Sequence, residues 1–437
     1  MLNKNNAIKQ IRVLLPDTNK NININVDGKN VIITGGNGCG KTRFLKLIYE
    51  QISAQIEQNE YKTHEKIKQE ITNRQSWMKH TSPTDRNYFS WKQQIADFEK
   101  QLIKMENINV ELVDLDRYCI DFNERKSLLR YFGAVRENNI SHSGTIDSLK
   151  TLRDEEISVS LSQDTSNKFE RYLVSLYNYG SHLIAREKNK TKGDKVDTWF
   201  CFLQKQFQYL FEDDSLRLDY NAEEQSFYIS QENKSPYRFN QLSSGYQSIL
   251  SIYADLLMKV ELKGITADEM SGVVFIDEID AHLHVSLQRK IFSFFVNAFP
   301  NIQFIVTTHS PFVVQSVNNA IIYDLSTNEQ LEDLSMYSYE AIVKGLLGVD
   351  TQSDLLNNQL DKLALLINEV IVDTEALQQV INNIQPYESQ LDMRSRTFLL
   401  MGKNALLDAK DAKDAKDAKD AKDAKDAKDA KDATEGE

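Results

Sequence analysis

A short glycine-rich segment near the N-terminus has the composition of a phosphate-binding loop. It matches the pattern G-x-x-x-x-G-K-[ST] at Gly35, Gly36, Asn37, Gly38, Cys39, Gly40, Lys41 and Thr42. Glycines let consecutive backbone N–H groups curve around a phosphate, and the positive end of a following helix adds to the attraction. Lys41 would then reach the β- and γ-phosphates of a nucleotide, while the Thr42 hydroxyl would bind Mg²⁺. The loop therefore predicts a site for ATP and Mg²⁺.

A pair of acidic residues, Asp277 and Glu278, ends the apolar run of "VVFIDEIDAHLH" at residues 273–284. A carboxylate at the end of a strand can hold the hydration shell of Mg²⁺, so Asp277 is a second magnesium candidate. Glu278 is placed to deprotonate an attacking water. His282 and His284 diverge at i, i+2 on the helix expected there, so they do not predict a metal site.

A histidine follows another apolar run in "IQFIVTTHSPF", where Thr307, Thr308 and His309 come directly after the strand. A histidine at this position can contact the γ-phosphate of a nucleotide and respond to its loss. The alternative is an ordinary structural histidine. We predict the nucleotide-contacting role for His309.

Two serines and a glycine stand before a run of helix-spaced apolar residues in "NQLSSGYQSIL", residues 240–250. Serine is a common helix cap, so Ser243 and Ser244 alone indicate little. A helix N-terminus also attracts anionic oxygen through its free N–H groups and its dipole. Ser243, Ser244 and Gly245 are therefore candidates for a second contact with phosphate.

The elements that carry these residues indicate an α/β fold. "NVIIT", "GVVFI" and "QFIVT" are apolar on consecutive positions, as expected of strands buried on both faces. Helix-spaced segments alternate with them, which predicts a mainly parallel core sheet.

Two helical insertions interrupt this pattern. In the first, Trp91, Ile95, Phe98, Leu102 and Met105 form the seam of a short coiled coil, either as a protruding arm or packed on the body. In the second, one helix face carries Val196, Trp199, Leu203, Phe207 and Leu210. The loop "REKNKTKGDK" at 186–195 has five basic residues against two acidic ones, which suits a nucleic-acid or partner contact or a solvated turn.

We expect seven segments along the chain. They are the first part of a nucleotide-binding head at 1–49, a helical hairpin at 50–106, head strands at 107–137, a second helical insertion at 138–215, the rest of the head at 216–337, a helical C-terminal segment at 338–407 and a low-complexity tail at 408–437. The tail holds eight copies of Asp-Ala-Lys. Because this repeat has a period of three residues, its charged side chains would not stay on one face of a helix.

The overall composition is that of a globular protein. The 437 residues are 41% hydrophobic and carry a net charge of −12, which argues against broad binding to a phosphate backbone, although a local basic face would not show in this sum. No apolar stretch is long enough to span a membrane, and the N-terminus lacks a secretion signal. Three scattered cysteines fit a reducing compartment, so we expect a cytoplasmic protein without a membrane partner.

The order of phosphate loop, "LSSGYQ", Asp-Glu and strand-end histidine resembles that of the ABC-type ATPases. "LSSGYQ" is similar to their signature motif L-S-G-G-Q, with Ser244 in place of the first glycine and Tyr246-Gln247 in place of the last residue. In that family the signature faces the nucleotide of a second subunit. The resemblance thus implies a homodimer, or a larger homo-oligomer, with two ATPs held between copies. Arg136 lies where many relatives carry a strand-end arginine, which implies a nucleotide-sensing role; the glutamine usual in the family is not identifiable.

Lys41 and Asp277 are 236 positions apart, and this separation, with its two helical insertions, resembles the SMC/RecF-like branch of this family. "IDEIDAHLH" and "IVTTHSPF" are most similar to ATPases of bacterial antiphage systems, such as PtuA of Septu and those of retron modules, with the PARIS ATPase and OLD nucleases as near relatives. The resemblance covers roughly residues 5–325 in pattern, and its specific motifs only about thirty residues. It implies an ATPase whose nucleotide state controls a separate HNH nuclease, with DNA or a retron nucleic acid as a further partner.

Three alternatives stay open from the sequence. A DNA-repair ATPase would share every motif and would need a basic face. A transport ATPase would need a membrane partner, and a non-hydrolysing scaffold would bind ATP without turnover. The helical segment 338–385 is too short for the nuclease domain of the OLD proteins. One face of it could bind a partner or pack in a core; that face comprises Leu355, Leu360, Leu363, Leu366 and Val370.

Overall fold

The computed structural model describes residues 7–15, 20–57, 64–136, 140, 144–158, 160–317, 319–332, 342, 353–367, 373–393, 395–411 and 413. The chain forms two compact units, Met1–Gly348 and Val349–Glu437. The first unit contains all the sequence motifs considered above. None of the described helices is long and apolar enough to cross a membrane.

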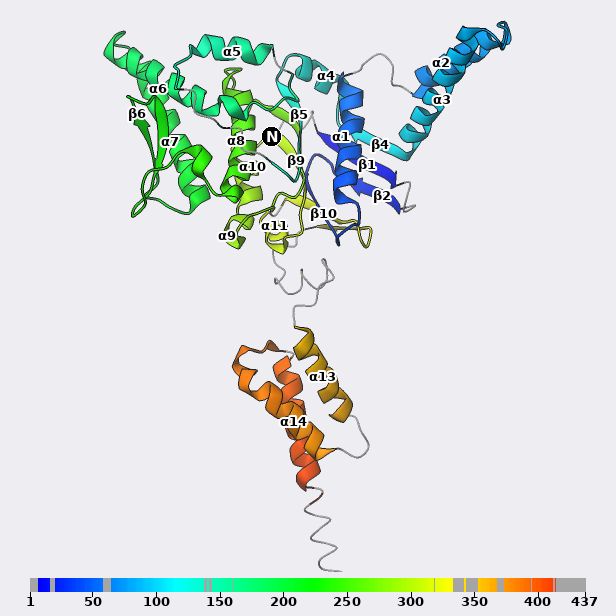
Figure 1. Ribbon diagram of the computed structural model, residues 1–437, viewed down its shortest axis with the longest axis vertical. Helices are drawn as coiled ribbons and strands as arrows, with labels where there is room; N and C mark the ends of the chain where they lie inside the picture. Colours follow the sequence, from blue (N-terminus) through cyan, green and yellow to red (C-terminus); the bar gives the residue numbers. More distant parts are fainter. Residues whose placement is uncertain are drawn as a thin grey trace, which may run out of the picture. The chain divides into compact units, whose positions relative to one another are not determined.

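A six-stranded sheet lies at the centre of the first unit (Figure 1). Its strand order is β11-β10-β3-β9-β8-β5. Its strands are β3 (Asn30–Thr34), β5 (Ser127–Phe132), β8 (Ser271–Ile276), β9 (Ile302–Thr307), β10 (Ala320–Asp324) and β11 (Glu329–Glu332). Neighbouring strands run parallel except for β10 and β11, which are antiparallel. The predicted α/β fold with a mainly parallel core sheet is confirmed.

The strands with consecutive apolar residues are buried on both faces of this sheet. In β8, Val274 and Ile276 pack into the core on one face, whereas Val273 and Phe275 pack into the core on the other. This alternation explains why the strand is apolar at every position instead of at every second one. The order of the strands determines where the motif residues lie relative to one another, because β9 lies between β3 and β8. The residues that follow β9 must therefore lie between the phosphate loop and the acidic pair.

A smaller antiparallel sheet of order β2-β1-β4 forms the β-rich N-terminal part. Its strands are β1 (Ile8–Leu15), β2 (Lys20–Asn25) and β4 (Ile108–Leu112). Helix α1 (Lys41–Glu57) packs in the same hydrophobic core and buries Phe44, Leu45, Ile48, Ile52 and Ile56. This burial fixes the axis of α1, so its first turn has a defined direction toward the sheet edge. The shorter helix α4 (Leu115–Asn123) follows β4.

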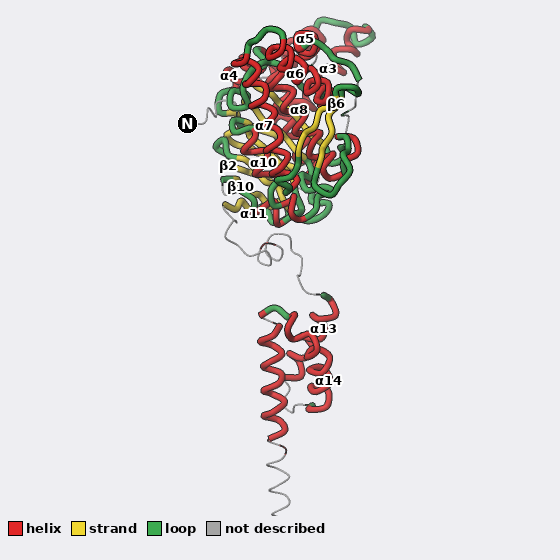
Figure 2. The backbone as a smooth tube through the Cα atoms, turned by 90° about the vertical axis from the view of Figure 1, so that its left-hand side faces the viewer, coloured by secondary structure: helices red, strands yellow, loops and turns green. Residues whose placement is uncertain are grey.

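The opposite face of the central sheet is covered by long helices, and Figure 2 shows α7, α8 and α10 in front of the strands. These helices are α6 (Phe169–Ala185), α7 (Lys190–Phe211), α8 (Ser244–Glu261) and α10 (Ile291–Ala298), and shorter ones are α5 (Leu149–Ile157), α9 (Val285–Gln288) and α11 (Pro311–Gln315). A hairpin of β6 (Arg217–Asn221) and β7 (Ser226–Ser230) follows α7. The apolar face predicted on α7 packs into this core, with Leu203, Phe207 and Leu210 buried.

A buried acid on α8 ties this helix to the sheet. The Asp255 carboxylate is fully buried and accepts a hydrogen bond from the Arg130 side chain on β5 at 2.7 Å. It also accepts bonds from the backbone N–H and the hydroxyl of Thr165, at 2.7 and 2.8 Å. A buried charge needs such partners, since leaving it unpaired would cost several kcal/mol, on the order of 3–5. The bond between Asp255 and Arg130 therefore holds α8, which begins at Ser244, against the central sheet.

The first insertion is a hairpin of α2 (His64–Lys79) and α3 (Arg86–Asn107). Figure 1 shows it projecting from the unit, and its two helices pack on each other, with Trp77 and Trp91 ring centroids 5.6 Å apart. Of the two arrangements left open by the sequence, the structure has the protruding arm. The side chain of Met105, which we predicted in the seam, lies outside the described residues.

The second unit contains α13 (Asp354–Ile367) and α14 (Thr374–Ile384), a 3₁₀ segment Gln385–Gln390 and a helix at 395–411. Leu363 is fully buried in its core, and Leu360 and Leu366 pack against that core. Core packing within this unit therefore accounts for most of the face that we considered for partner binding. Leu355 is exposed, and Val370 lies outside the described residues, as does the tail from residue 414.

Candidate nucleotide-binding site

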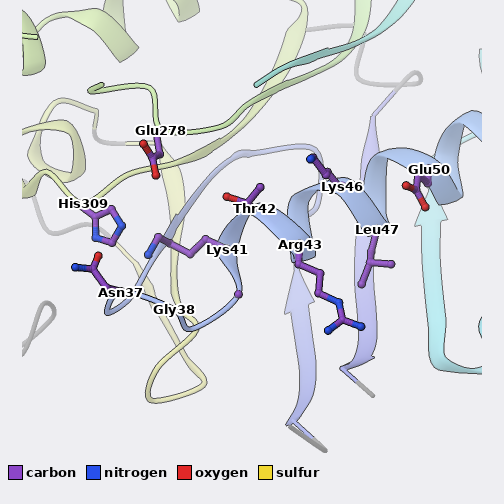
Figure 3. Close-up of a pocket in the computed structure, with 11 residues that line it drawn as sticks. Asn37, Gly38, Lys41, Thr42, Arg43, Lys46, Leu47, Glu50, Glu278 and His309 are labelled. Atoms are coloured by element: carbon purple, nitrogen blue, oxygen red, sulfur yellow. The ribbon is translucent and has the colours of Figure 1, made fainter. Parts of the chain in front are cut away.

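A pocket of about 550 Å³ opens at the carboxyl edge of the central sheet (Figure 3). It is lined by Asn37, Gly38, Gly40, Lys41, Thr42, Arg43, Lys46, Leu47, Glu50, Glu278 and His309. The pocket therefore joins the phosphate loop with the residues that end β8 and β9. Its volume lies within the roughly 300–1,000 Å³ typical of small-molecule sites.

The phosphate loop needs glycine for its backbone. Gly35, Gly38 and Gly40 have φ values of +136°, +76° and +99°, a region that side chains with a Cβ rarely adopt. A Cβ on Gly35 would also lie 2.9 Å from the Ser326 hydroxyl. That hydroxyl accepts a hydrogen bond from the Gly36 N–H at 2.7 Å. The loop is thus supported from the turn after β10, a contact that the sequence motif does not indicate.

Lys41 is largely buried at the start of α1, with its ammonium group directed into the loop. Its Nζ donates to the carbonyl oxygens of Gly35 and Gly36, at 2.9 and 3.1 Å. Figure 3 shows Lys41 pointing toward Asn37 and His309. A fixed cation at the centre of a ring of backbone groups is the arrangement expected for binding a phosphate.

The acidic pair and β9 are connected through a threonine that the sequence analysis did not single out. The Thr307 hydroxyl donates to Oδ1 of Asp277 at 2.6 Å and accepts a bond from the Glu278 N–H at 2.7 Å. Asp277 is almost completely buried. The Asp277 N–H in turn donates to the Phe132 carbonyl at the end of β5, at 2.8 Å. Asp277 is thus held by both neighbouring strands.

Glu278 has a strained backbone, with a φ of +47°. For a residue with a Cβ this conformation costs on the order of 1–3 kcal/mol, and such strain concentrates at functional sites. Here the turn aims the Glu278 side chain into the pocket, where it lines the wall opposite the phosphate loop. The arrangement suits a carboxylate that must contact a bound water instead of the protein.

His309 is half-buried and lines the same pocket. Burial and the nearby Lys41 ammonium lower the pKa of His309 below its usual value of 6.5, while Asp280 and Glu278 oppose this shift. The imidazole is therefore neutral at pH 7. A neutral imidazole can donate one hydrogen bond and accept another, which suits contact with a phosphate oxygen or a water.

Arg136 is directed away from the pocket lining. Its guanidinium donates to the main-chain carbonyl of Asp277, to that of Glu278 at 2.9 Å, and to the Ser248 hydroxyl on α8 at 2.8 Å. Its Nε donates to the Gly133 carbonyl at 2.8 Å. Burial lowers the pKa of Arg136 to about 10, so it remains charged at neutral pH. These contacts join β5, β8 and α8, and the bond to Glu278 is to the main chain of a residue whose side chain lines the pocket.

Ser243, Ser244 and Gly245 lie outside this pocket. Ser243 and Ser244 are exposed, and the Ser243 side chain makes no capping bond to α8, although it occupies the cap position. Ser243 instead lines a smaller pocket of about 240 Å³ together with Lys234 and Tyr246. Gly245 is buried. A Cβ there would lie 2.7 Å from the His282 carbonyl oxygen, so this close approach requires glycine. Within one chain the structure brings together the phosphate loop, Glu278 and His309, but not the serines.

Several pocket residues on α1 were missed by the motif. Lys46 and Glu50 follow Thr42 at intervals of four residues, so they lie on the same helix face. Helical spacing from Thr42 could have identified them. Among the described residues there is no cluster of three or more His, Cys, Asp or Glu suited to a metal ion.

Known proteins are similar to parts of this chain. A family model described as "AAA domain, putative AbiEii toxin, Type IV TA system" matches residues 202–315. The chain is 35% identical over 158 residues to the Septu protein PtuA of Bacillus mycoides (strain KBAB4), covering 34% of this chain and 22% of that protein. It is 39% identical over 95 residues to the "Retron Ec83 probable ATPase" of Escherichia coli, covering 21% of this chain and 18% of that protein.

These matches confirm the predicted resemblance to the ATPases of Septu and retron systems. The chain spans about a fifth of the length of these two relatives. Among solved structures it is similar to an Smc head bound to the C-winged helix domain of ScpA, with a TM-score of 0.36 and 12% identity over 76% of this chain and 100% of that one. That similarity is too remote to bear on function.

Proposed function

We propose that this chain is the ATPase subunit of an antiphage defence system, which dimerises around two ATP molecules and controls a separate nuclease of the HNH type. The observation that supports this most directly is the division of the motif residues. Lys41, Glu278 and His309 line one pocket, whereas Ser243 lies exposed beside another. A second phosphate contact that cannot reach the site of its own chain is best explained by a site on another copy.

The residues at the pocket fit ATP with Mg²⁺. The backbone of the phosphate loop and Lys41 would bind the β- and γ-phosphates, and Thr42 and Asp277 would hold the ion. When bound, Mg²⁺ neutralises phosphate charge and so makes the terminal phosphorus easier to attack. Thr307 keeps Asp277 in place through the 2.6 Å bond, which orients its carboxylate at the strand end.

Hydrolysis in this proposal depends on Glu278. Its carboxylate would accept a proton from the attacking water as that water bonds to the γ-phosphorus and the bond to the β–γ bridging oxygen breaks. His309, neutral at pH 7, would hydrogen-bond to a γ-phosphate oxygen or to the same water. Loss of the γ-phosphate would remove that contact, so the site can report whether ATP or ADP is bound.

The dimer would close the site from the other side. The Ser243 hydroxyl makes no capping bond, and the first N–H groups of α8 lie at the exposed helix start. A helix N-terminus of this kind stabilises negative charge by about 0.3–1 kcal/mol, and more when the contact is partly buried. In the dimer the γ-phosphate bound by one chain would meet Ser243 of the other.

A complementation experiment tests the shared site. Chains with Lys41→Ala and chains with Ser243→Arg should each hydrolyse ATP poorly. Mixed together, they form heterodimers in which the phosphate loop of the Ser243→Arg chain faces the intact signature of the Lys41→Ala chain, so turnover should return. Lys41→Ala mixed with Glu278→Gln is the control, because both defects fall in the same pocket and no intact site can form. Absence of recovery in heterodimers verified by mass would contradict the proposal.

The effector role has its own test. When this chain is combined with a candidate HNH nuclease, DNA cleavage should differ between ATP-bound Glu278→Gln protein and ADP-bound wild type. If cleavage is the same in both states, nucleotide does not control the nuclease, even if ATP turnover is intact. If wild-type protein binds ATP and never hydrolyses it, a non-hydrolysing scaffold replaces the ATPase in the proposal.

A further inference from the structure

The tip of the α2–α3 hairpin has a charge opposite to that of the chain as a whole. Residues 74–92 contain four basic side chains, Arg74, Lys79, Arg86 and Lys92, and one acidic side chain, Asp85. The rest of the hairpin, 64–73 and 93–107, has five acidic and four basic residues. A net charge of +3 is thus confined to the tip, on a protein whose total is −12.

The single acid at the tip does not neutralise these cations, because it has a structural role. Asp85 is the N-cap of α3, and its carboxylate accepts the Asn87 N–H at 2.8 Å. Arg74 is also engaged, since it bonds to Glu70 and Gln94 and lies over the Phe98 ring at 4.8 Å. Three exposed cations remain, Lys79, Arg86 and Lys92, and none forms an ion pair with another described residue.

Aromatic side chains lie among these cations. Phe89 is 64% exposed and Trp77 is 48% exposed, although both are large apolar groups on a projecting arm. Arg86 and Lys92 are each three residues from Phe89 on α3, so both are its neighbours on the exposed helix face. Trp77 packs on Trp91 across the hairpin, which fixes its ring at the tip. On α3 the result is a cation, an aromatic ring and a second cation at successive intervals of three residues.

We propose that this hairpin tip binds single-stranded nucleic acid. Exposed aromatic rings bind unpaired bases by stacking, which needs no particular sequence, and flanking cations bind the phosphates on either side. A duplex keeps its bases stacked inside, so it would leave Phe89 and Trp77 without a partner. The two helices fix the backbone that carries these side chains, so binding does not have to order the main chain of the tip. DNA and RNA strands share this chemistry.

The test uses the purified full-length chain and fluorescence anisotropy with three labelled probes: a 20-nucleotide DNA strand, an RNA strand of the same sequence and the blunt DNA duplex. We expect at least one single strand to bind more tightly than the duplex. Phe89→Ala should weaken that binding roughly tenfold, since a stacked base is usually worth that much. The triple change Lys79→Glu, Arg86→Glu and Lys92→Glu should flatten the salt dependence by a slope of about 2, since each phosphate contact on a single strand contributes roughly 0.7.

Matched controls come from elsewhere on the same chain. Phe202→Ala removes an aromatic ring of 52% exposure on α7 and should leave binding unchanged. Lys188→Glu with Lys190→Glu and Lys192→Glu reverses three charges of the other basic segment, 186–195, and should have a much smaller effect than the hairpin triple. All the hairpin variants should keep the ATP turnover of the wild type, which separates this proposal from that of the nucleotide site.

Four results would overturn the proposal. One is that no probe binds at low salt. A second is that the duplex binds as tightly as the strands and Phe89→Ala has no effect. A third is that only the 186–195 triple reduces binding, which would place the nucleic acid on the α6–α7 corner. The last is that Phe89→Ala changes the mass of the assembly and leaves probe binding intact, in which case the tip is a contact between copies.

Discussion

At the scale of single residues, the site depends on side chains whose freedom has been removed. Asp277 is fixed by Thr307 and by the N–H bond to β5, and Lys41 is held by two loop carbonyls. Glu278 differs, because its backbone is strained and its side chain faces the pocket. This contrast is the one that the proposed function requires between groups that would bind the nucleotide and one that would act on water.

Glu278→Gln should reduce ATP turnover by 10²-fold or more, because a positioned general base contributes about 10²–10⁴-fold. The amide keeps the size of the side chain, so ATP affinity should stay within a few-fold of wild type. Steady-state phosphate release and equilibrium binding of a fluorescent ATP analogue measure the two quantities. Turnover near the wild-type rate would exclude Glu278 as the base.

The pKa of His309 gives a prediction about pH. Burial and Lys41 both disfavour the charged imidazolium, so its titration midpoint without nucleotide should lie below 6.5. Lys41→Met removes the positive charge and should raise the midpoint, as should bound polyphosphate. NMR titration of the ring signals, assigned by comparison with His309→Gln, measures this. A midpoint above 6.5 in nucleotide-free wild type would contradict the described environment of His309.

At the scale of elements, Arg136 links the end of β5 and the end of β8 with α8. It contacts the main chain of the candidate base on one side and Ser248 on the other. Ser248 is one turn after Ser244, at the start of the helix that would meet the ATP of a second copy. A change at the α8 start can therefore be transmitted to Glu278 through one side chain.

Arg136→Lys should lower kcat about tenfold or more and change ATP affinity little. A lysine keeps the charge but cannot span three acceptors, and each charge-assisted bond lost is worth about 1.5–3 kcal/mol. Ser248→Ala removes only the contact to α8 and should give a milder loss of kcat with nearly unchanged thermal stability. If Arg136→Lys instead weakens ATP binding and spares kcat, Arg136 has the nucleotide-sensing role that the resemblance implies.

The sequence predicts the fold class and the pocket residues that follow strands, but not those further along α1 such as Lys46 and Glu50. Lys41, Glu278 and His309 each follow a strand buried on both faces, and parallel strands end at one edge. Arg136 was harder to interpret, because its acceptors are mainly backbone carbonyls, which leave no mark in the residue pattern. The seam spacing of α3 defined which face meets α2 but not whether the pair leaves the body. Likewise, Leu363 has the same spacing whether it packs in a core or binds a partner.

At the scale of the whole molecule, the proposed nucleotide site requires a second copy of the chain. One chain holds a pocket with a phosphate loop and a base, and an exposed serine at a helix start that does not line this pocket. None of the residues that line this pocket belongs to the projecting hairpin. Nucleotide-driven association is thus the central claim, and it is independent of any effector.

The most direct test of that claim is the mass of the Glu278→Gln protein in solution, measured by analytical ultracentrifugation with and without ATP and Mg²⁺. We predict that ATP doubles the mass of the nucleotide-free species and that ADP does not. Adding Ser243→Arg to the same chain should abolish the doubling while ATP still binds to each copy. If the mass is the same with and without ATP, or if Ser243→Arg leaves the association intact, ATP is not shared between two chains.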